Sequence, residues 1–297
     1  MFESRLGETA ALLTAISWTA SALTLEAACK RASSLAVNLI RLSVGLVFLS
    51  AYCGLSRGMA LPLDATGHAW LWLSLSGVIG FAVGDICLLR AFAVIGARIS
   101  MLIMASVPPM TALIGWTLLG ETLSMRSSLG MAMTVGGIIL VVMERDRGKE
   151  GKLSHSVAGV LLAFGGALGQ AVGLVLSKYG MGAYSAFAST QIRIFAGVAG
   201  LFFVFAVTWG WKSLGAALRD RRTVVLSSTG GFLSATLGVS FSLLAVQHTT
   251  TGVASTIMSI VPVLIIPPAV VLFKERVTAR EVAGAVIAVA GVALLFL

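Results

Sequence analysis

Apolar residues follow one another along this chain in ten long runs, which short polar segments separate. Each run holds about 20 residues, enough to cross the hydrocarbon core of a bilayer as a helix. The longest polar connection runs from about Gly210 to Thr223, so no soluble domain has room to fold between the runs. The predicted helices cover residues 9–27, 35–56, 70–90, 99–119, 127–143, 156–176, 184–209, 224–246, 253–273 and 281–297.

The pattern of the middle of the chain returns in its last third. At a constant offset, the corresponding pairs are Gly84 and Gly238, Ala91 and Ala245, Pro108 and Pro262, Glu121 and Glu275, and Gly130 and Gly284. With the offset shortened by two residues, Arg41 corresponds to Arg193. Each copy holds five predicted helices, and an odd number of crossings inserts the second copy upside down. The sequence therefore predicts an all-α integral membrane protein, with ten transmembrane helices in two inverted five-helix repeats, residues 1–150 and 151–297.

The composition agrees with a chain dissolved in lipid. Hydrophobic residues make up 58% of it and charged residues 11%, with a mean hydropathy of +0.99. A water-soluble domain of this length would expose too much apolar surface with that composition. Inverted repeats in a membrane are typical of secondary transporters, whose substrate path lies where the two halves meet.

The net charge of +9 reflects orientation and not nucleic-acid binding. Most of the 21 lysines and arginines fall in the connections that follow odd-numbered predicted helices. The opposite side carries Arg5, Arg57, Arg126 and Lys178. Because basic loops stay in the cytoplasm, we expect a multi-pass protein of the cell inner membrane with both termini in the periplasm. The basic surface also suits contact with anionic membrane lipid.

The two halves resemble a known family. Each has an Arg in its second helix, a Pro within its fourth, a Glu at that helix's end and a Gly-rich fifth helix. These positions are Arg41 and Arg193, Pro108 and Pro262, Gly120-Glu121 and Lys274-Glu275, and Gly130 to Gly137 with Gly284 to Gly291. In this plan the chain resembles the EamA-type branch of the drug/metabolite transporter superfamily. The resemblance implies a ten-helix exporter of small metabolites, amino acids among them, with a central cavity between the halves.

Asp85 is a carboxylate inside predicted helix 70–90, and its counterpart in the second repeat is Val239. Ionisable side chains are costly in hydrocarbon and usually line a polar path. Asp85 could titrate a proton or bind a substrate amine, and we include proton coupling among the expectations. Alternatively, it could pair locally with Arg90 or Arg41.

Three further kinds of charged position have structural and functional interpretations. Arg41 and Arg193, present in both repeats, could tie helix ends together or contact substrate directly. Glu26 stands four residues before Lys30, a spacing typical of a helical ion pair, although it could instead face a cavity. For Glu121 and Glu275, at the ends of their helices, we expect helix capping or pairing with nearby arginines.

Predicted helix 9–27 carries a polar stripe beside a tryptophan. Thr14, Ser17, Ser21 and Thr24 recur at helical spacing. Trp18 stands near the midplane, away from the interfaces where membrane tryptophans usually lie, and its counterpart in the second repeat is Gln170. Small residues around Gln170 permit close helix contact. The stripe could line a binding site with Trp18, Ser17, Ser21 and Gln170 in its walls, or it could be a packing seam.

Proline interrupts both fourth helices at matching positions. Pro108 and Pro262 each remove a backbone donor, and paired interruptions in two halves point to a transporter's site. Met104 and Met258, beside these interruptions, could supply an adaptable apolar wall. A simple packing kink is the alternative.

We therefore expect a transporter that moves a small-molecule substrate through a midplane cavity by rocking two inverted halves. The alternatives are a membrane-embedded enzyme acting on a lipid-linked substrate and a non-transporting membrane subunit. The sequence shows no cluster of His, Cys or carboxylates that catalysis would need, so we expect no cofactor and no bound metal. Cys29, Cys53 and Cys87 show no metal-binding or redox spacing.

Overall fold

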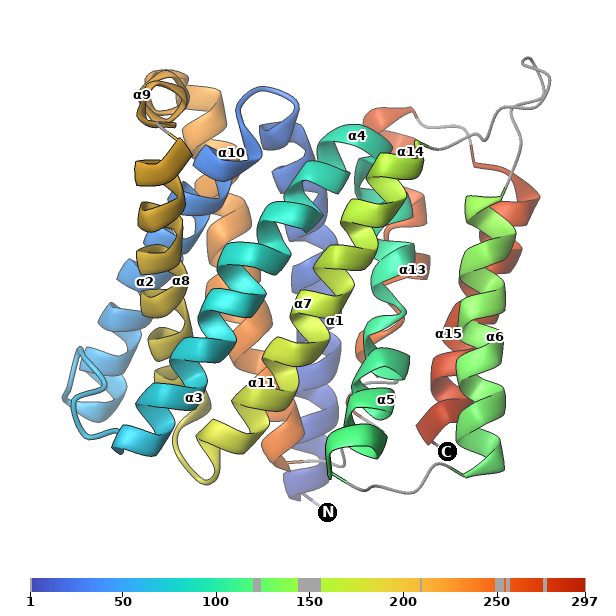
Figure 1. The fold of residues 1–297 in the computed structure, drawn as a ribbon, viewed down its shortest axis with the longest axis horizontal. Coiled ribbons are helices and arrows are strands. Elements are labelled where there is room, and N and C mark those ends of the chain that lie inside the picture. The colour runs from blue at the N-terminus through green and yellow to red at the C-terminus, as the bar shows by residue number, and fades with distance from the viewer. Residues whose placement is uncertain are drawn as a thin grey trace.

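The computed structural model describes residues 2–119, 124–143, 156–208, 210–248, 254, 257–274 and 277–296. These residues form helices and turns, with no strand among them. Most helices lie side by side, and both chain ends lie at the same end of the bundle (Figure 1). The protein is an all-helical integral membrane protein with two repeats.

The first repeat contains α1 (Phe2–Cys29), α2 (Ser34–Arg57), α3 (Gly67–Gly77), the π-helix η1 (Val78–Gly84), α4 (Asp85–Met104), α5 (Val107–Leu119) and α6 (Met125–Val142). The second repeat contains α7 (Val157–Met181), α8 (Ala186–Thr208), α9 (Trp211–Arg219), α10 (Arg221–Gly231), the π-helix η2 (Phe232–Gly238), α11 (Val239–His248), α13 (Val261–Leu264), α14 (Ile266–Phe273) and α15 (Ala279–Phe296).

Short polar side chains fix where several helices begin. The hydroxyl of Ser33 accepts a hydrogen bond from the backbone N–H of Ala36 at the start of α2, at 3.3 Å. Thr66 and Ser124 cap α3 and α6 in the same way. These residues satisfy N–H groups that have no partner within the first turn of a helix. In hydrocarbon such groups would be costly, so the caps set where the spans start.

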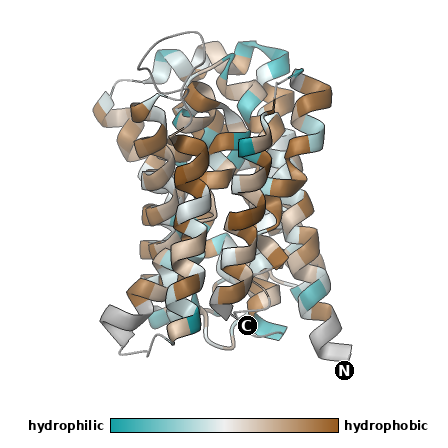
Figure 2. Cartoon of the chain, turned by 90° about the vertical axis from the view of Figure 1, so that its right-hand side faces the viewer, coloured by the Kyte–Doolittle hydropathy of each residue, from teal (hydrophilic) through white to brown (hydrophobic). Residues whose placement is uncertain are grey.

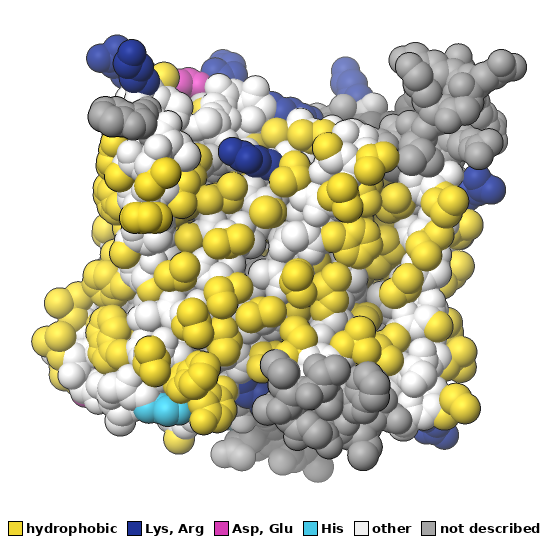
Figure 3. Space-filling model, viewed as in Figure 1, with side chains coloured by type: hydrophobic (Ala, Val, Ile, Leu, Met, Phe, Trp, Pro, Cys, Tyr) yellow, Lys and Arg dark blue, Asp and Glu magenta, His cyan; other side chains and the backbone are white. Residues whose placement is uncertain are grey.

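Side chains on the outside of the bundle are suited to lipid. Hydrophobic positions cover the length of the helices, and hydrophilic positions gather toward the two ends (Figure 2). Large apolar side chains such as Val47, Leu161 and Phe203 are exposed. On the face shown in Figure 3, Lys and Arg gather mostly at the end opposite the termini. This distribution follows the basic bias of the predicted connections.

The two repeats meet through matching backbone contacts. A Cβ on Gly77 would lie 2.0 Å from the carbonyl oxygen of Arg193, and a Cβ on Gly231 would lie 2.5 Å from that of Arg41. Gly77 and Gly231 are counterparts, as are Arg41 and Arg193, so each contact repeats the other. Glycine is what permits helices to approach this closely. The pseudo-symmetry read from the sequence therefore continues into the packing between the halves.

Both repeats carry a π-helix at the same place, which the apolar pattern did not predict. η1 and η2 each span seven residues and directly follow the contact glycines Gly77 and Gly231. A π-helix pairs each N–H with the carbonyl five residues earlier instead of four. In the first repeat the side-chain amide of Asn38 donates to the carbonyl oxygen of Phe81 at 2.8 Å, so α2 is tied to η1.

The predicted helices 99–119 and 253–273 are interrupted and not continuous. The first breaks at Ala105 and Ser106 and resumes as α5, where Pro108 is the second residue. In the second repeat the break falls at 259–260, and Pro262 lies in the first turn of α13. Proline is tolerated at the start of a helix because its missing N–H would have no partner there. Each proline thus begins a new segment instead of bending an intact helix.

Two other boundaries differ from the prediction. α4 runs through the predicted connection after residue 90 and changes direction at Gly96, whose φ of 79° favours glycine. The predicted connection between residues 210 and 223 contains α9, a short helix lying across the ends of its neighbours (Figure 1). In the described residues, seven helices are long and apolar enough to span a membrane. Ten crossings therefore stay a prediction.

The fifth helices of the repeats, α6 and α15, pack mainly on each other (Figure 1). A Cβ on Gly137 would lie 2.6 Å from the carbonyl oxygen of Gly284, and one on Gly284 would lie 2.7 Å from that of Gly137. Gly291 approaches the backbone of Thr134 in the same way. The predicted Gly-rich fifth helices therefore form a tight pair.

Gly77→Ala should destabilise the protein by about 1–3 kcal/mol, the usual cost of forcing extra atoms into a packed interface. The matched control is Gly136→Ala in α6, because a Cβ there meets nothing within 4 Å. The control should be neutral or slightly stabilising, since alanine favours helix more than glycine does. Thermal unfolding of the two purified variants measures the difference. Equal melting temperatures would contradict the close packing of α3 on α8.

Candidate functional site

A cavity of about 1460 Å³ lies between the two repeats. Small-molecule sites commonly have volumes of about 300–1,000 Å³, so this cavity is larger than usual. At the end of the bundle near the termini it reaches exposed residues, among them Lys178, Tyr179 and Gln247. From there it extends inward to Leu25 and Phe92. The cavity is therefore open toward the end that carries both termini.

Eight of the nine residues that the sequence singled out line this cavity. They are Trp18, Ser21, Asp85, Met104, Pro108, Gln170, Met258 and Pro262. The ninth, Ser17, is buried but is not among the lining residues. Trp18, Ser21, Ala22 and Leu25 define the side of α1 that faces the cavity, and Ser17 lies at the edge of that side, about 100° around the helix from Trp18.

The polar stripe of α1 divides between the cavity and a packing seam. Ser21 lies on the cavity, and its hydroxyl donates to the carbonyl oxygen of Trp18 at 3.0 Å. Thr14 is buried, and its hydroxyl lies 3.4 Å from the carbonyl oxygen of Gly238 in η2. A Cβ on Gly238 would lie only 2.5 Å from the indole of Trp18. The absence of a side chain at Gly238 is thus what gives the indole its place.

Gln170 lies at the equivalent contact in the other half. Here α7 packs on η1, and a Cβ on Gly169 would lie 2.7 Å from the α-carbon of Gly84. The small residues around Gln170 therefore do make a close helix contact, as their spacing indicated. Gln170 and Trp18 reach the cavity from opposite repeats.

The helix interruptions also lie at the cavity. Met104 and Pro108 flank the break of the first repeat, and Met258 and Pro262 flank the break of the second. At the first break the hydroxyl of Ser106 donates to the carbonyl oxygen of Ile103 at 2.7 Å. The backbone N–H of Ser106 donates to the same carbonyl oxygen at 2.9 Å, so Ser106 closes the turn at the break.

Two arginines and one aspartate form the charged part of the inner cavity. Asp85 forms an ion pair with Arg41, which is one of the two local pairings considered from the sequence. Arg90, the other candidate partner, is exposed. Arg193 lies with its guanidinium carbon 4.6 Å from the centre of the Phe81 ring. Sequence reasoning gave the two arginines mainly a structural role, but both line the cavity.

Several lining residues were missed at the sequence level. Phe81, Thr111, Lys178, Ser234 and His248 all reach the cavity. Lys178 and His248 stand at helix ends near the mouth, where a sequence offers no sign of which way a side chain turns. The counterpart relation of Phe81 with Ala235 was readable, but its meaning depends on the position of Arg193.

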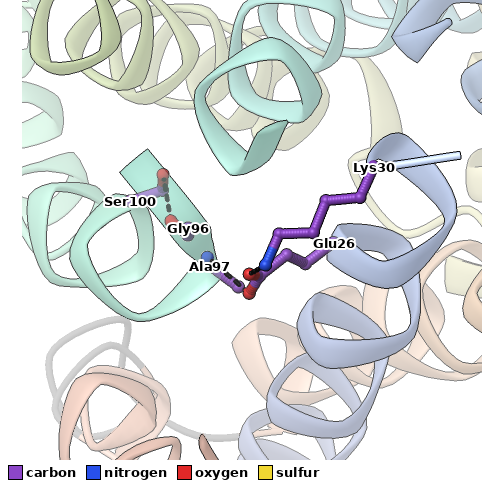
Figure 4. Close-up of polar contacts among 5 residues, drawn as sticks. All are labelled: Glu26, Lys30, Gly96, Ala97 and Ser100. Atoms are coloured by element: carbon purple, nitrogen blue, oxygen red, sulfur yellow. Dashed lines mark hydrogen bonds and ion pairs between the residues drawn. The ribbon is translucent and has the colours of Figure 1, made fainter. Parts of the chain in front are cut away.

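The inner end of the cavity stops at buried residues such as Leu25 and Phe92. Next to them α1 contacts α4 (Figure 4). Glu26 is buried, and its carboxylate accepts a hydrogen bond from the backbone N–H of Ala97 at 2.8 Å. It also pairs with Lys30, as its spacing predicted. Ala97 directly follows the turn at Gly96, so Glu26 caps the helix segment that begins there. The interpretation of Glu26 as a cavity residue is not supported, since it is not in the lining.

Ion pairs reinforce this closed end. Arg98 Nη1 lies 2.8 Å from Glu281 Oε2, which joins α4 to α15 in a largely buried pair. Arg31 Nε donates to Asp220 Oδ2 at 2.9 Å between the α1–α2 turn and the start of α10. That hydrogen bond holds the pKa of Asp220 at about 2. Glu121 and Glu275, for which capping was expected, lie outside the described residues.

Comparisons with known proteins agree with this architecture. One solved crystal structure, described only as that of a protein, superimposes with a TM-score of 0.67 over 97% of this chain and 95% of that chain. At 16% identity the likeness shows a shared fold. No curated protein matches the chain. The EamA-like transporter family matches residues 5–143 and 157–297, one match in each half. The chain belongs to the EamA-like transporter family and is a membrane transporter of the drug/metabolite transporter superfamily.

Proposed function

We propose that this transporter exports small metabolites, such as amino acids, by alternating access around the cavity between its two repeats. One observation carries the proposal, namely a cavity lined by both repeats that is open at one end and closed at the other. A secondary transporter needs such a site, reached from one side of the membrane at a time. An enzyme or a structural subunit has no such requirement.

The arrangement corresponds to a state that faces outward. Its open end carries the termini, and its closed end carries the basic connections that positive-inside orientation places in the cytoplasm. Opening toward the cytoplasm would have to release the contact of Glu26 with Ala97 and the pair of Arg98 with Glu281. We propose these two contacts as the inner gate of a protein of the cell inner membrane.

Transport by the purified chain in proteoliposomes tests the function. A panel of metabolites is screened for counterflow, and transport by the chain alone separates a transporter from a subunit or an enzyme.

Trp18→Ala should weaken binding of the active solute by about 10- to 30-fold, because a large aromatic side chain is lost from the cavity wall. Trp211→Ala is the control, since Trp211 packs on Phe205 in α8, with 5.4 Å between ring centroids, and does not line the cavity. Equal effects of the two substitutions on binding would show that Trp18 does not contact the solute.

Orientation is tested by thiol labelling in a variant that lacks Cys29, Cys53 and Cys87. Ser242→Cys places a thiol on the cavity wall, and Ser240→Cys places one two residues away, fully buried and off the cavity. An impermeant methanethiosulfonate reagent added to whole cells should label residue 242 and spare residue 240. Labelling of residue 242 only after the cells are opened would reverse the proposed orientation.

Proton coupling through Asp85 is tested with Asp85→Asn. We expect the variant to transport with a flattened pH profile, because an amide cannot titrate. Asp64→Asn is the control, since Asp64 is exposed, and its hydrogen bond from Tyr184 lowers the carboxyl pKa. The control should keep the wild-type profile. If Asp85→Asn keeps the wild-type pH profile of transport, Asp85 takes no part in proton coupling and only neutralises Arg41.

A further inference from the structure

The two buried arginines of the cavity differ in one respect. Arg41 is paired with Asp85, so their charges compensate each other. Arg193 is 3% exposed and also lines the cavity, but no carboxylate pairs with it among the described residues. Its Nε has no hydrogen-bond partner in the described part of the chain, but the same holds for the Nε of Arg41, so the difference lies in the missing acid. With two arginines and one aspartate, the inner cavity holds one positive charge in excess, and Asp85 acts on Arg193 only from beyond ion-pair distance.

The pseudo-symmetry explains why this arginine has no carboxylate. The counterpart of Arg41 is Arg193, and the counterpart of Asp85 is Val239, which also lines the cavity. The backbone contacts of Gly77 and Gly231 show that the two arginines occupy equivalent places in the fold. The second repeat therefore keeps the cation and has an apolar side chain where the first has an acid.

An aromatic ring supports Arg193 instead. The guanidinium lies 4.6 Å from the ring centre of Phe81, a cation–π contact. Such a contact fixes the plane of the group but uses none of its five N–H donors. Two glycines border the group, and a Cβ on Gly80 or Gly173 would meet Nη2 at 3.5 or 3.6 Å, an ordinary contact distance. A buried cation without a paired acid is costly in a folded protein, so an anionic ligand is the expected partner.

The rest of the lining defines the body of that ligand. Trp18, Leu88, Phe92, Met101 and Leu243 present apolar surface to the cavity. A guanidinium binds a planar oxyanion through two parallel hydrogen bonds. We propose that Arg193 binds the anionic group of the substrate, which is a small monoanion, such as a monocarboxylate, with an apolar body. This inference rests on the proposed transport function and names the substrate class of the same cavity.

The same geometry offers no binding partner to an ammonium group on the substrate. Asp85 is the one carboxylate among the described lining residues, and Arg41 already occupies it. A substrate ammonium group therefore finds no free acid in the cavity. An amino acid should bind through its carboxylate, and its ammonium group should add no affinity.

The test compares four probes that share one apolar body. They are 3-phenylpropionate, its neutral amide, 3-phenylpropylamine and L-phenylalanine, titrated against the purified full-length protein while tryptophan fluorescence and thermal unfolding are recorded. The propionate should bind about 10- to 100-fold more tightly than the amide, as expected for hydrogen bonds between charged groups. The amine should bind least, and phenylalanine no more tightly than the propionate. No detectable propionate binding, or an amide that binds as tightly, would overturn the proposal.

Substitutions at Val239 test the role of Arg193 while keeping the arginine itself. Arg193→Gln removes the charge but also the group that packs on Phe81, so it could fail to fold. Val239→Asp instead supplies the missing carboxylate and should reduce the preference for propionate over amide to less than about twofold. Val239→Asn, equal in size and uncharged, should keep most of the preference. Retention of the preference in Val239→Asp would overturn the role of Arg193.

Counterflow with the same probes separates this inference from the transport proposal. Binding that favours the propionate without any counterflow would keep the anion site and exclude transport of that probe. Counterflow of other solutes, together with equal binding of propionate and amide, would keep the transporter and exclude the anion site.

Discussion

In a bilayer, backbone groups that leave the regular helical pattern need partners inside the protein, and this constraint accounts for contacts at two irregular parts of the structure. Asn38 reaches the carbonyl oxygen of Phe81 in η1, and Glu26 caps the helix that restarts after Gly96. The irregular segments occur where the repeats meet or where the cavity lies. Where the backbone leaves the regular helix, side chains of the protein thus supply hydrogen bonds to it.

Much of the fold could be predicted because it depends on local signals. The length of apolar runs gave most helices, and the duplicated positions gave the two repeats. The π-helices η1 and η2 could not be read, because they depend on contacts with Trp18, Gly169 and Arg193 from distant segments. The breaks before Pro108 and Pro262 were located to within a few residues. Proline indicates where a helix cannot continue but does not show which turn gives way.

The candidate site was partly readable for the same reason. Trp18 and Gln170 were found because they are counterparts near midplane depth, and both line the cavity. Ser17 shares a stripe with Ser21, but it is buried and is not among the lining residues. The pairing of Asp85 could not be decided from the sequence, because Arg41 and Arg90 were both within reach. For Arg193 the sequence left substrate contact open, but only the structure shows that the acid nearby pairs with Arg41 instead.

The unpaired charge of Arg193 has an electrical consequence. Moving one elementary charge across a membrane potential changes the free energy by about 2.3 kcal/mol per 100 mV. If the conformational change carries the inner cavity through part of that field, the empty carrier moves a positive charge, whereas the carrier loaded with a monoanion moves none. The resting potential then acts on the return of the empty transporter and leaves the loaded step untouched. One valine in place of an aspartate is enough to make that difference between the two halves of the cycle.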